Sequence, residues 1–125
     1  MSEKKIKILV MEDDPFLRSV YEVKLANEGF EVKIASDGKE GIEIYSKFKP
    51  DIILLDIIMP EIDGFAVLEE LKVKKKVKTP IVVLSNLGQD EDVEKAKELG
   101  ADDFLIKAST QINSVVDKIK LMLKK

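Results

Sequence analysis

Lys5-Ile-Lys-Ile-Leu-Val-Met11 is an apolar run that stops abruptly at three acids, Glu12, Asp13 and Asp14. Three later apolar runs also end on a polar group: Ile52-Ile-Leu-Leu55 on Asp56, Ile81-Val-Val-Leu84 on Ser85, and Asp103-Phe-Leu-Ile106 on Lys107. Continuous apolar runs are typical of strands in a parallel sheet that is covered on both faces. The four runs therefore predict buried strands whose ends carry groups suited to binding a metal ion and a phosphoryl group.

Segments with helical periodicity alternate with these strands. The predicted strands lie near residues 5–11, 30–35, 51–55, 80–84 and 103–107, and the predicted helices near residues 15–28, 38–47, 64–74, 90–99 and 111–124. Five such β/α units indicate an α/β fold, a five-stranded parallel sheet with helices on both faces and right-handed crossovers. Ligands of such sheets bind at the carboxyl ends of the strands. The topology should therefore gather the polar strand ends at one edge.

Several residues predict where the helices begin and end. Asp14 can cap the first helix, and Asp37 with Glu40 three residues later indicates a capping pair at the second. Gly29 and Gly100 follow the first and fourth helices, where a left-handed C-terminal cap is usual.

The composition limits the possible chemistry. The 125 residues suit one domain, so we expect residues 1–125 to form a single unit. The chain has no cysteine and no histidine, which excludes disulfides, zinc–thiolate sites, cysteine nucleophiles and Ser-His-Asp catalysis. The net charge is −3 and only one of the 21 basic residues is arginine, which gives no general case for nucleic-acid binding. No apolar run could span a bilayer, and we expect a cytoplasmic protein without a membrane partner.

One local basic cluster stands out from this background. Cations at the end of a helix oppose the negative end of its dipole, so a solvated helix C-terminus is the favoured interpretation. The cluster consists of Lys72, Lys74, Lys75, Lys76 and Lys78.

The acids at the predicted strand ends indicate a cation site. Converging carboxylates repel one another unless they are protonated or neutralised by a cation. A set of oxygen ligands suits Mg²⁺, which prefers octahedral coordination by one or two carboxylates and a phosphate. Acids at a helix N-terminus are also favoured by the helix dipole, which explains Asp14 but leaves the acid at Asp56 unexplained.

Asp56, Ser85 and Lys107 each have an ordinary structural explanation as well as a functional one. Asp56 could form a local Asx-turn, or it could be a nucleophile that forms an acyl phosphate. Lys107 could be a lysine whose stem lies along apolar surface, or a point-charge partner of a phosphoryl group. Ser85 alone carries no signal, since hydroxyls are common at strand ends. The joint pattern favours the functional interpretation.

The chain resembles a response-regulator receiver domain of bacterial two-component signalling, and in particular the single-domain chemotaxis regulators. The resemblance covers essentially the whole chain. It rests on Ile8-Leu-Val-Met-Glu-Asp-Asp14, Lys49-Pro-Asp-Ile-Ile-Leu-Leu-Asp56-Ile-Ile-Met-Pro60, Asp63-Gly64-Phe65, Pro80-Ile-Val-Val-Leu-Ser85 and Gly100-Ala-Asp-Asp-Phe-Leu-Ile-Lys107. It implies the flavodoxin-like strand order 2-1-3-4-5.

The resemblance also implies roles for individual residues. Asp56 matches the phosphoacceptor, Ser85 the hydroxyl that bonds the phosphoryl oxygen, and Lys107 the lysine of the family. Phe104 falls where the family carries its aromatic switch residue. The implied magnesium ligands are Glu12, acting largely through water, Asp13, Asp56 and the backbone carbonyl of Ile58.

The sequence departs from the family pattern after the lysine. The family usually has a proline there with a cis peptide bond, and this chain has Ala108. A non-proline cis bond costs roughly 2.5–4 kcal/mol, so both a trans and a strained Lys107–Ala108 link are open. In the family, the positions two after the phosphoacceptor and two after the hydroxyl residue flank the path of a hydrolytic water. Here they hold Ile58 and Leu87, so the resemblance implies slow loss of the phosphoryl group.

We therefore interpret the chain as a signalling switch rather than an enzyme. It would accept a phosphoryl group on Asp56 from a histidine kinase or phosphotransfer protein, with Mg²⁺. The change would reach an effector protein through the fourth helix, fifth strand and fifth helix. Three alternatives stay open: a receiver that belongs to a longer regulator with an output domain, a Mg²⁺-dependent aspartyl phosphohydrolase, and a scaffold that is never phosphorylated.

Overall fold

A computed structural model describes residues 5–86 and 89–124. Its centre is one parallel sheet with the strand order β2-β1-β3-β4-β5, which confirms the predicted fold and order. The strands are β1 (Lys7–Met11), β2 (Glu31–Ala35), β3 (Ile52–Leu55), β4 (Ile81–Ser85) and β5 (Asp103–Ile106).

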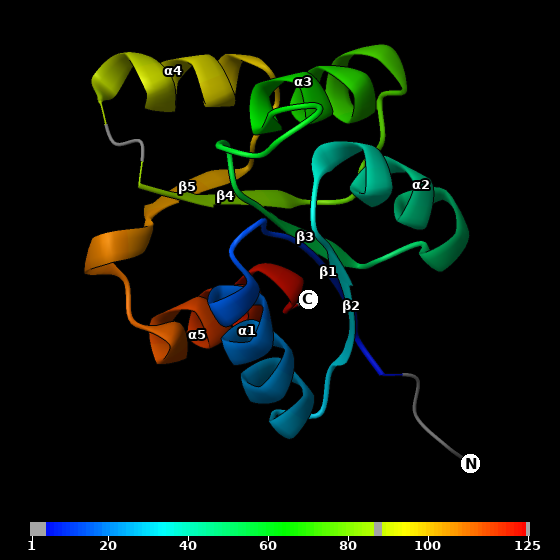
Figure 1. Cartoon of the computed structure of the whole chain (residues 1–125), viewed down its shortest axis with the longest axis vertical. Helices are drawn as coiled ribbons and strands as arrows, with labels where there is room; N and C mark the ends of the chain where they lie inside the picture. Colours follow the sequence, from blue (N-terminus) through cyan, green and yellow to red (C-terminus); the bar gives the residue numbers. More distant parts are fainter. Residues whose placement is uncertain (1–4, 87–88, 125) are drawn as a thin grey trace.

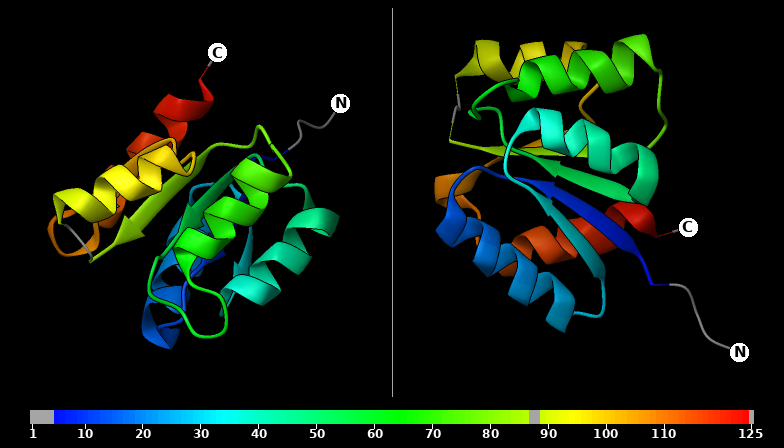
Figure 2. Two further views of the ribbon diagram at one scale, coloured as in Figure 1. Left: turned by 90° about the horizontal axis from the view of Figure 1, so that it is seen from above. Right: turned by 45° about the vertical axis from the view of Figure 1, so that its right-hand side comes forward.

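Helices cover both faces of the sheet (Figures 1 and 2). One face carries α1 (Pro15–Asn27) and α5 (Ile112–Leu123), and the other carries α2 (Gly38–Phe48), α3 (Gly64–Leu68) and α4 (Asp90–Glu98). Alternate strand residues serve the two layers: Leu9 and Met11 pack in the α2–α4 layer, and Ile8 and Val10 in the α1–α5 layer. No helix in the described part of the chain is long and apolar enough to cross a bilayer.

The second and fifth strands, at the two edges of the sheet, differ from the predicted pattern, and β5, which was predicted to be buried, is only half-buried throughout. β1, β3 and β4 are buried almost throughout, as continuous apolar runs should be. β2 lies at the edge of the sheet and alternates, with Glu31 and Lys33 exposed. An edge strand has solvent on one side, so polar residues are tolerated at alternate positions.

The predicted helix ends are confirmed. The Asp14 carboxylate accepts hydrogen bonds from the backbone amides of Phe16 (2.8 Å) and Leu17 (3.2 Å). Asp37 accepts from the amide of Glu40 (2.8 Å). Gly29 and Gly100 have φ angles of 94° and 106°, the left-handed conformation expected of helix C-caps.

The third predicted helix is not uniformly α-helical. It begins as α3 and continues as a π-helix, η1 (Glu69–Lys74). A π-helix inserts residues into the turn without changing which residue types favour helix, so periodicity did not predict it. The lysine cluster at its end is solvated as expected: Lys74, Lys75, Lys76 and Lys78 are exposed, and only Lys72 is partly buried.

The predicted fifth strand ends one residue early. Lys107 begins a short 3₁₀-helix, η2 (Lys107–Ser109), and its peptide bond to Ala108 is trans. The amide of Ala108 donates a hydrogen bond to the side-chain oxygen of Asn86 (2.8 Å), which joins the segments after β4 and β5.

Candidate functional site

The carboxyl ends of β1, β3, β4 and β5 lie side by side along one side of the sheet, which we call its carboxyl edge. Met11 lies opposite Leu55 in the β1–β3 register, so the next residues, Glu12 and Asp56, leave the sheet side by side. Ser85 lies opposite Ile106 in the β4–β5 register. Parallel pairing therefore brings together residues that are up to 95 positions apart in the sequence.

Lys107 connects the acids of β1 and β3. Its ammonium nitrogen lies 2.7 Å from Glu12 Oε1 and 2.9 Å from Asp56 Oδ2. Both carboxylates are buried, with 2% of Glu12 and 6% of Asp56 exposed. Two buried carboxylates thus share one ammonium group, which partly compensates their mutual repulsion.

Burial and charge shift the ionisation of these groups in different ways. Burial raises the pKa of Glu12 above its ordinary value, and the hydrogen bond from Lys107 opposes this shift without cancelling it. Burial alone would lower the pKa of Lys107, but its hydrogen bonds to Glu12 and Asp56 outweigh burial and raise it. Lys107 is therefore a permanent cation at neutral pH.

The acidic cluster has the composition of a site for a hard cation. Glu12, Asp13 and Asp56 can each offer one carboxylate oxygen, and these oxygens lie within 4.8 Å of one another. Asp13 is the most exposed of the three. Oxygen ligands at this spacing fit Mg²⁺ better than a transition metal, which would favour imidazole or thiolate ligands.

The loop after β3 presents its backbone to the same site. The amide of Ile58 donates to Asp56 Oδ1 (3.3 Å), and the Ile58 side chain is 56% exposed. Ser85 is buried at the end of β4, and Phe104 is half-buried against the α2–α4 layer. The predicted roles of Ser85, Phe104 and the Ile58 carbonyl stay predictions, and Leu87 lies outside the described residues.

Two residues that support the site were not predicted. The guanidinium group of Arg18 donates hydrogen bonds to the backbone carbonyls of Glu12 (3.2 Å) and Asp13 (2.7 Å), which fixes the acidic turn. Its position one turn into α1 as the only arginine could have indicated this role. The bond between Asn86 and Ala108 spans 22 positions, and no local pattern in the sequence indicates it.

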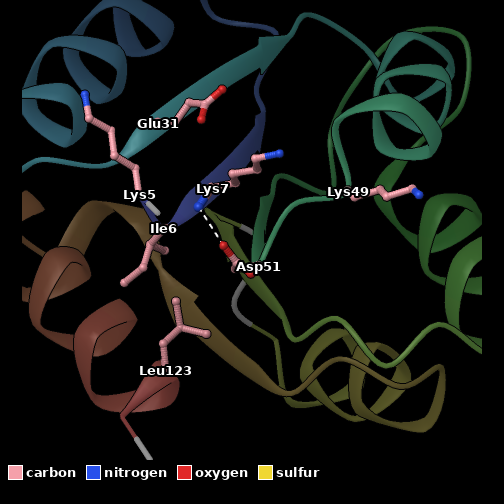
Figure 3. Close-up of a pocket in the computed structure, with 7 residues that line it drawn as sticks. All are labelled: Lys5, Ile6, Lys7, Glu31, Lys49, Asp51 and Leu123. Atoms are coloured by element: carbon pink, nitrogen blue, oxygen red, sulfur yellow. Dashed lines mark hydrogen bonds between the residues drawn. The ribbon is translucent and has the colours of Figure 1, made fainter. Parts of the chain in front are cut away.

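One open hollow of about 660 Å³ lies at the opposite edge of the sheet (Figure 3). It is lined by the amino-terminal ends of strands, among them Lys7 of β1, and by Leu123 at the end of α5. The ammonium groups of Lys5 and Lys7 point apart in Figure 3. The Asp51 carboxylate accepts a hydrogen bond from the backbone amide of Lys7 (2.8 Å). This hollow contains none of the carboxyl-edge residues.

Comparison with known proteins agrees with this geometry. The model of the response regulator receiver domain family matches residues 8–120. The chain is 38% identical over 105 residues to the probable transcriptional regulator ycf27 of Guillardia theta, and 30% identical over 120 residues to the DNA-binding dual master transcriptional regulator RpaA of Synechocystis. These alignments cover 84% and 95% of this chain but 41% and 49% of the two relatives. The chain thus spans less than half the length of either.

Solved structures show the same fold. The BeF3-activated N-terminal receiver domain of Klebsiella pneumoniae RstA superposes with a TM-score of 0.87 at 29% identity, covering 95% of this chain and 99% of that one. The CheY-like response regulator receiver domain protein of Methanospirillum hungatei gives a TM-score of 0.89 at 25% identity, covering 96% and 94%.

Proposed function

The chain belongs to the response regulator receiver domain family, and on that premise we propose that it is a switch that accepts a phosphoryl group on Asp56. The observation that carries the proposal is the pair of hydrogen bonds from Lys107 to Glu12 and Asp56. These bonds join a cation, a candidate metal ligand and the candidate nucleophile at the carboxyl edge of the sheet. The proposal covers residues 1–125 as one receiver domain, located in the cytoplasm.

The transfer that we propose exchanges one bond to phosphorus for another. An Asp56 carboxylate oxygen attacks the phosphorus of a phosphohistidine, so a P–O bond forms as the P–N bond breaks. The ring nitrogen leaves with the electron pair, and a donor ring protonated at its other nitrogen leaves as neutral imidazole. Catalysis in this scheme is mainly positioning and electrostatic stabilisation.

The residues around Asp56 have different roles in this transfer. The Lys107 ammonium group, already 2.9 Å from Asp56, stabilises negative charge on the transferring oxygens. Glu12, Asp13, Asp56 and the Ile58 carbonyl would hold Mg²⁺, which supplies further positive charge at the phosphoryl oxygens when bound. Ser85 would then bond a phosphoryl oxygen, and Phe104 would move into the space that Ser85 leaves.

Phosphorylation would change the surface formed by α4, β5 and α5. Only Ala96 of α4 is fully buried, so few apolar contacts oppose movement of this helix. The partners that we propose are a histidine kinase or phosphotransfer protein as donor and an effector protein on this face. The chain acts either alone or as the receiver part of a longer regulator, as its length relative to the relatives allows.

The rival functions predict different behaviour. An aspartyl phosphohydrolase needs an acid/base group close to its nucleophile, and two residues after Asp56 stands the apolar Ile58. A scaffold would not respond to a phosphoryl analogue at all. Beryllofluoride with Mg²⁺ should shift the amide resonances of α4, β5 and α5, with no turnover of p-nitrophenyl phosphate. Unchanged resonances would favour the scaffold, and multiple turnover would favour the phosphohydrolase.

A further inference from the structure

The loop between β3 and α3, residues 56–63, folds back tightly on itself at the edge of the candidate site. Three hydrogen bonds brace it: Ile58 N to Asp56 Oδ1 (3.3 Å), Ile62 N to the Pro60 carbonyl (2.9 Å) and Gly64 N to the Ile57 carbonyl (2.8 Å). The bond from Gly64 to Ile57 ties the end of the loop to its start, next to Ile58, and the other two bonds close short turns at Ile58 and Ile62. A displacement at Ile62, two residues before Gly64, is therefore passed to the start of the loop through this bond. The backbone of Ile58 therefore depends on where the rest of the loop lies.

Gly38, the first residue of α2, touches this loop from another part of the chain. It is buried, and α2 packs beside α3 (Figure 1). A β-carbon on Gly38 would lie 2.4 Å from the carbonyl oxygen of Ile62 and 2.8 Å from a methyl group of Val67. β-carbons do not approach other atoms closer than about 3.0 Å, so any other residue would push its neighbours apart by at least 0.6 Å.

A side chain at residue 38 would displace the loop rather than α2. α2 is fixed at its start by the Asp37 cap and is seated closely on the sheet, since a β-carbon on Gly41 would lie 2.4 Å from the Met11 sulfur. The Ile62 carbonyl belongs to a segment that lies outside every helix and strand. A displacement of half an ångström or more at Ile62 is large for metal ligands, whose geometry must be held closely.

We propose that Gly38 is a positioning residue for the candidate metal and phosphoacceptor site. The absence of a side chain at residue 38 lets the β3–α3 loop lie where the Ile58 backbone faces the carboxylates. Gly38 itself touches neither the metal nor the phosphoryl group. This inference rests on the proposed function, because it assumes that Mg²⁺ binds at Asp56.

Gly38→Ala compared with Gly41→Ala tests the proposal. Both substitutions add one methyl group to the buried face of α2 and gain the same helix propensity. The new methyl group at residue 38 meets a backbone carbonyl of the loop, whereas at residue 41 it meets only atoms of the buried Met11 side chain. Titration with Mg²⁺ followed by amide resonances should show affinity about 10-fold weaker or more for Gly38→Ala. Gly41→Ala should lose less Mg²⁺ affinity than Gly38→Ala, because it displaces the Met11 side chain and no part of the β3–α3 loop.

A structural signature accompanies the loss of affinity. In the metal-free Gly38→Ala protein, the amide resonances of Ile58 and Gly64 should already be shifted from their wild-type positions. A variant that is only less stable would keep these resonances in place while folded. Wild-type affinity in Gly38→Ala, or unshifted loop resonances, would overturn the proposal.

The wild-type protein offers a test that needs no variant. Coupling between two sites is reciprocal, so Mg²⁺ binding should move the amide resonance of Gly38 as well as that of Ile58. The amide of Gly29, at the far end of α1, should stay unchanged. If Mg²⁺ saturates the site without moving the Gly38 resonance, the positioning role is wrong even if Gly38→Ala fails to fold. If wild type binds no Mg²⁺, the proposed function itself fails.

Discussion

Replacing Lys107 with methionine should lower the free energy of unfolding by about 3 kcal/mol at pH 7 in the absence of divalent cations. Methionine keeps most of the apolar stem but removes the ammonium group that lies 2.7 Å from Glu12 and 2.9 Å from Asp56. The side chains of these acids are only 3% and 7% exposed, so water cannot take the place of the cation. The variant would contain two buried carboxylates with no cation beside them, each still accepting one hydrogen bond from a backbone amide.

Protonation limits the part of this loss that comes from Glu12. A carboxyl group that loses its cation can bind a proton instead and become neutral. From the ordinary glutamate pKa of 4.5, a proton at pH 7 costs 2.5 pH units at 1.36 kcal/mol each, about 3.4 kcal/mol. Burial already raises the pKa of Glu12, so protonation of Glu12 costs less than this figure in the folded protein. The total of about 3 kcal/mol is the usual loss when one partner of a buried ion pair is removed.

Urea unfolding followed by circular dichroism at pH 7 and pH 4.5 would measure the effect. The difference between variant and wild type should shrink at pH 4.5, because protonated carboxyl groups no longer need the ammonium group. Lys118→Met is the matched control: it removes a 2.5 Å pair with Asp103 whose side chains are 31% and 29% exposed. Such a pair should contribute less than about 1 kcal/mol. If the two variants lose equal stability, or if the Lys107→Met loss does not change with pH, the reasoning fails.

Three further predictions concern the same edge of the sheet. Asp13→Ala should weaken Mg²⁺ binding, whereas Asp14→Ala should leave it intact and cost about 1 kcal/mol of stability through the lost helix cap; equal losses in Mg²⁺ titrations would mean that the ligand is misassigned. Glu12→Gln should raise the urea midpoint at pH 7 without divalent cations, because the fold favours the neutral form of a group whose pKa is raised. The contribution of Glu12 to the stability of wild type is present below pH 4.5 and is lost as the pH rises through the raised pKa. A Glu12→Gln protein that is less stable than wild type at pH 7 would contradict this direction of the effect. Ile58→Asn with Leu87→Glu should shorten the lifetime of the phosphorylated protein in a chase experiment, because both substitutions supply polar contacts for a hydrolytic water; an unchanged half-life would show that these side chains do not control it.

The sequence was sufficient to predict the fold, because the hydrophobic pattern and the rules of sheet topology lead to the same architecture. Apolar runs of strand length separated by helical periodicity leave little choice beyond a parallel sheet covered on both faces. Once the strands are parallel, the residues that follow them must meet at one edge. The contacts of Lys107 with Glu12 and Asp56 follow from that rule, although the residues are far apart in the chain.

Features that depend on three-dimensional packing were not predictable in the same way. The π-helical turn at Glu69–Lys74 has the composition of an ordinary helix. The bond between Asn86 and Ala108 depends on where two loops end. The close approach of Gly38 to Ile62 also depends on how α2 and the β3–α3 loop pack, and a glycine in a capping sequence gives no sign of it.

Intact-mass measurement after incubation with acetyl phosphate tests the central claim most directly. With Mg²⁺, wild type should gain one phosphoryl group, and without a divalent cation it should gain none. Asp56→Asn should gain none under either condition, while circular dichroism shows that it is folded. A phosphoryl adduct on Asp56→Asn, or a wild-type adduct that forms equally well without a divalent cation, would contradict the assignment of Asp56 as a Mg²⁺-dependent phosphoacceptor.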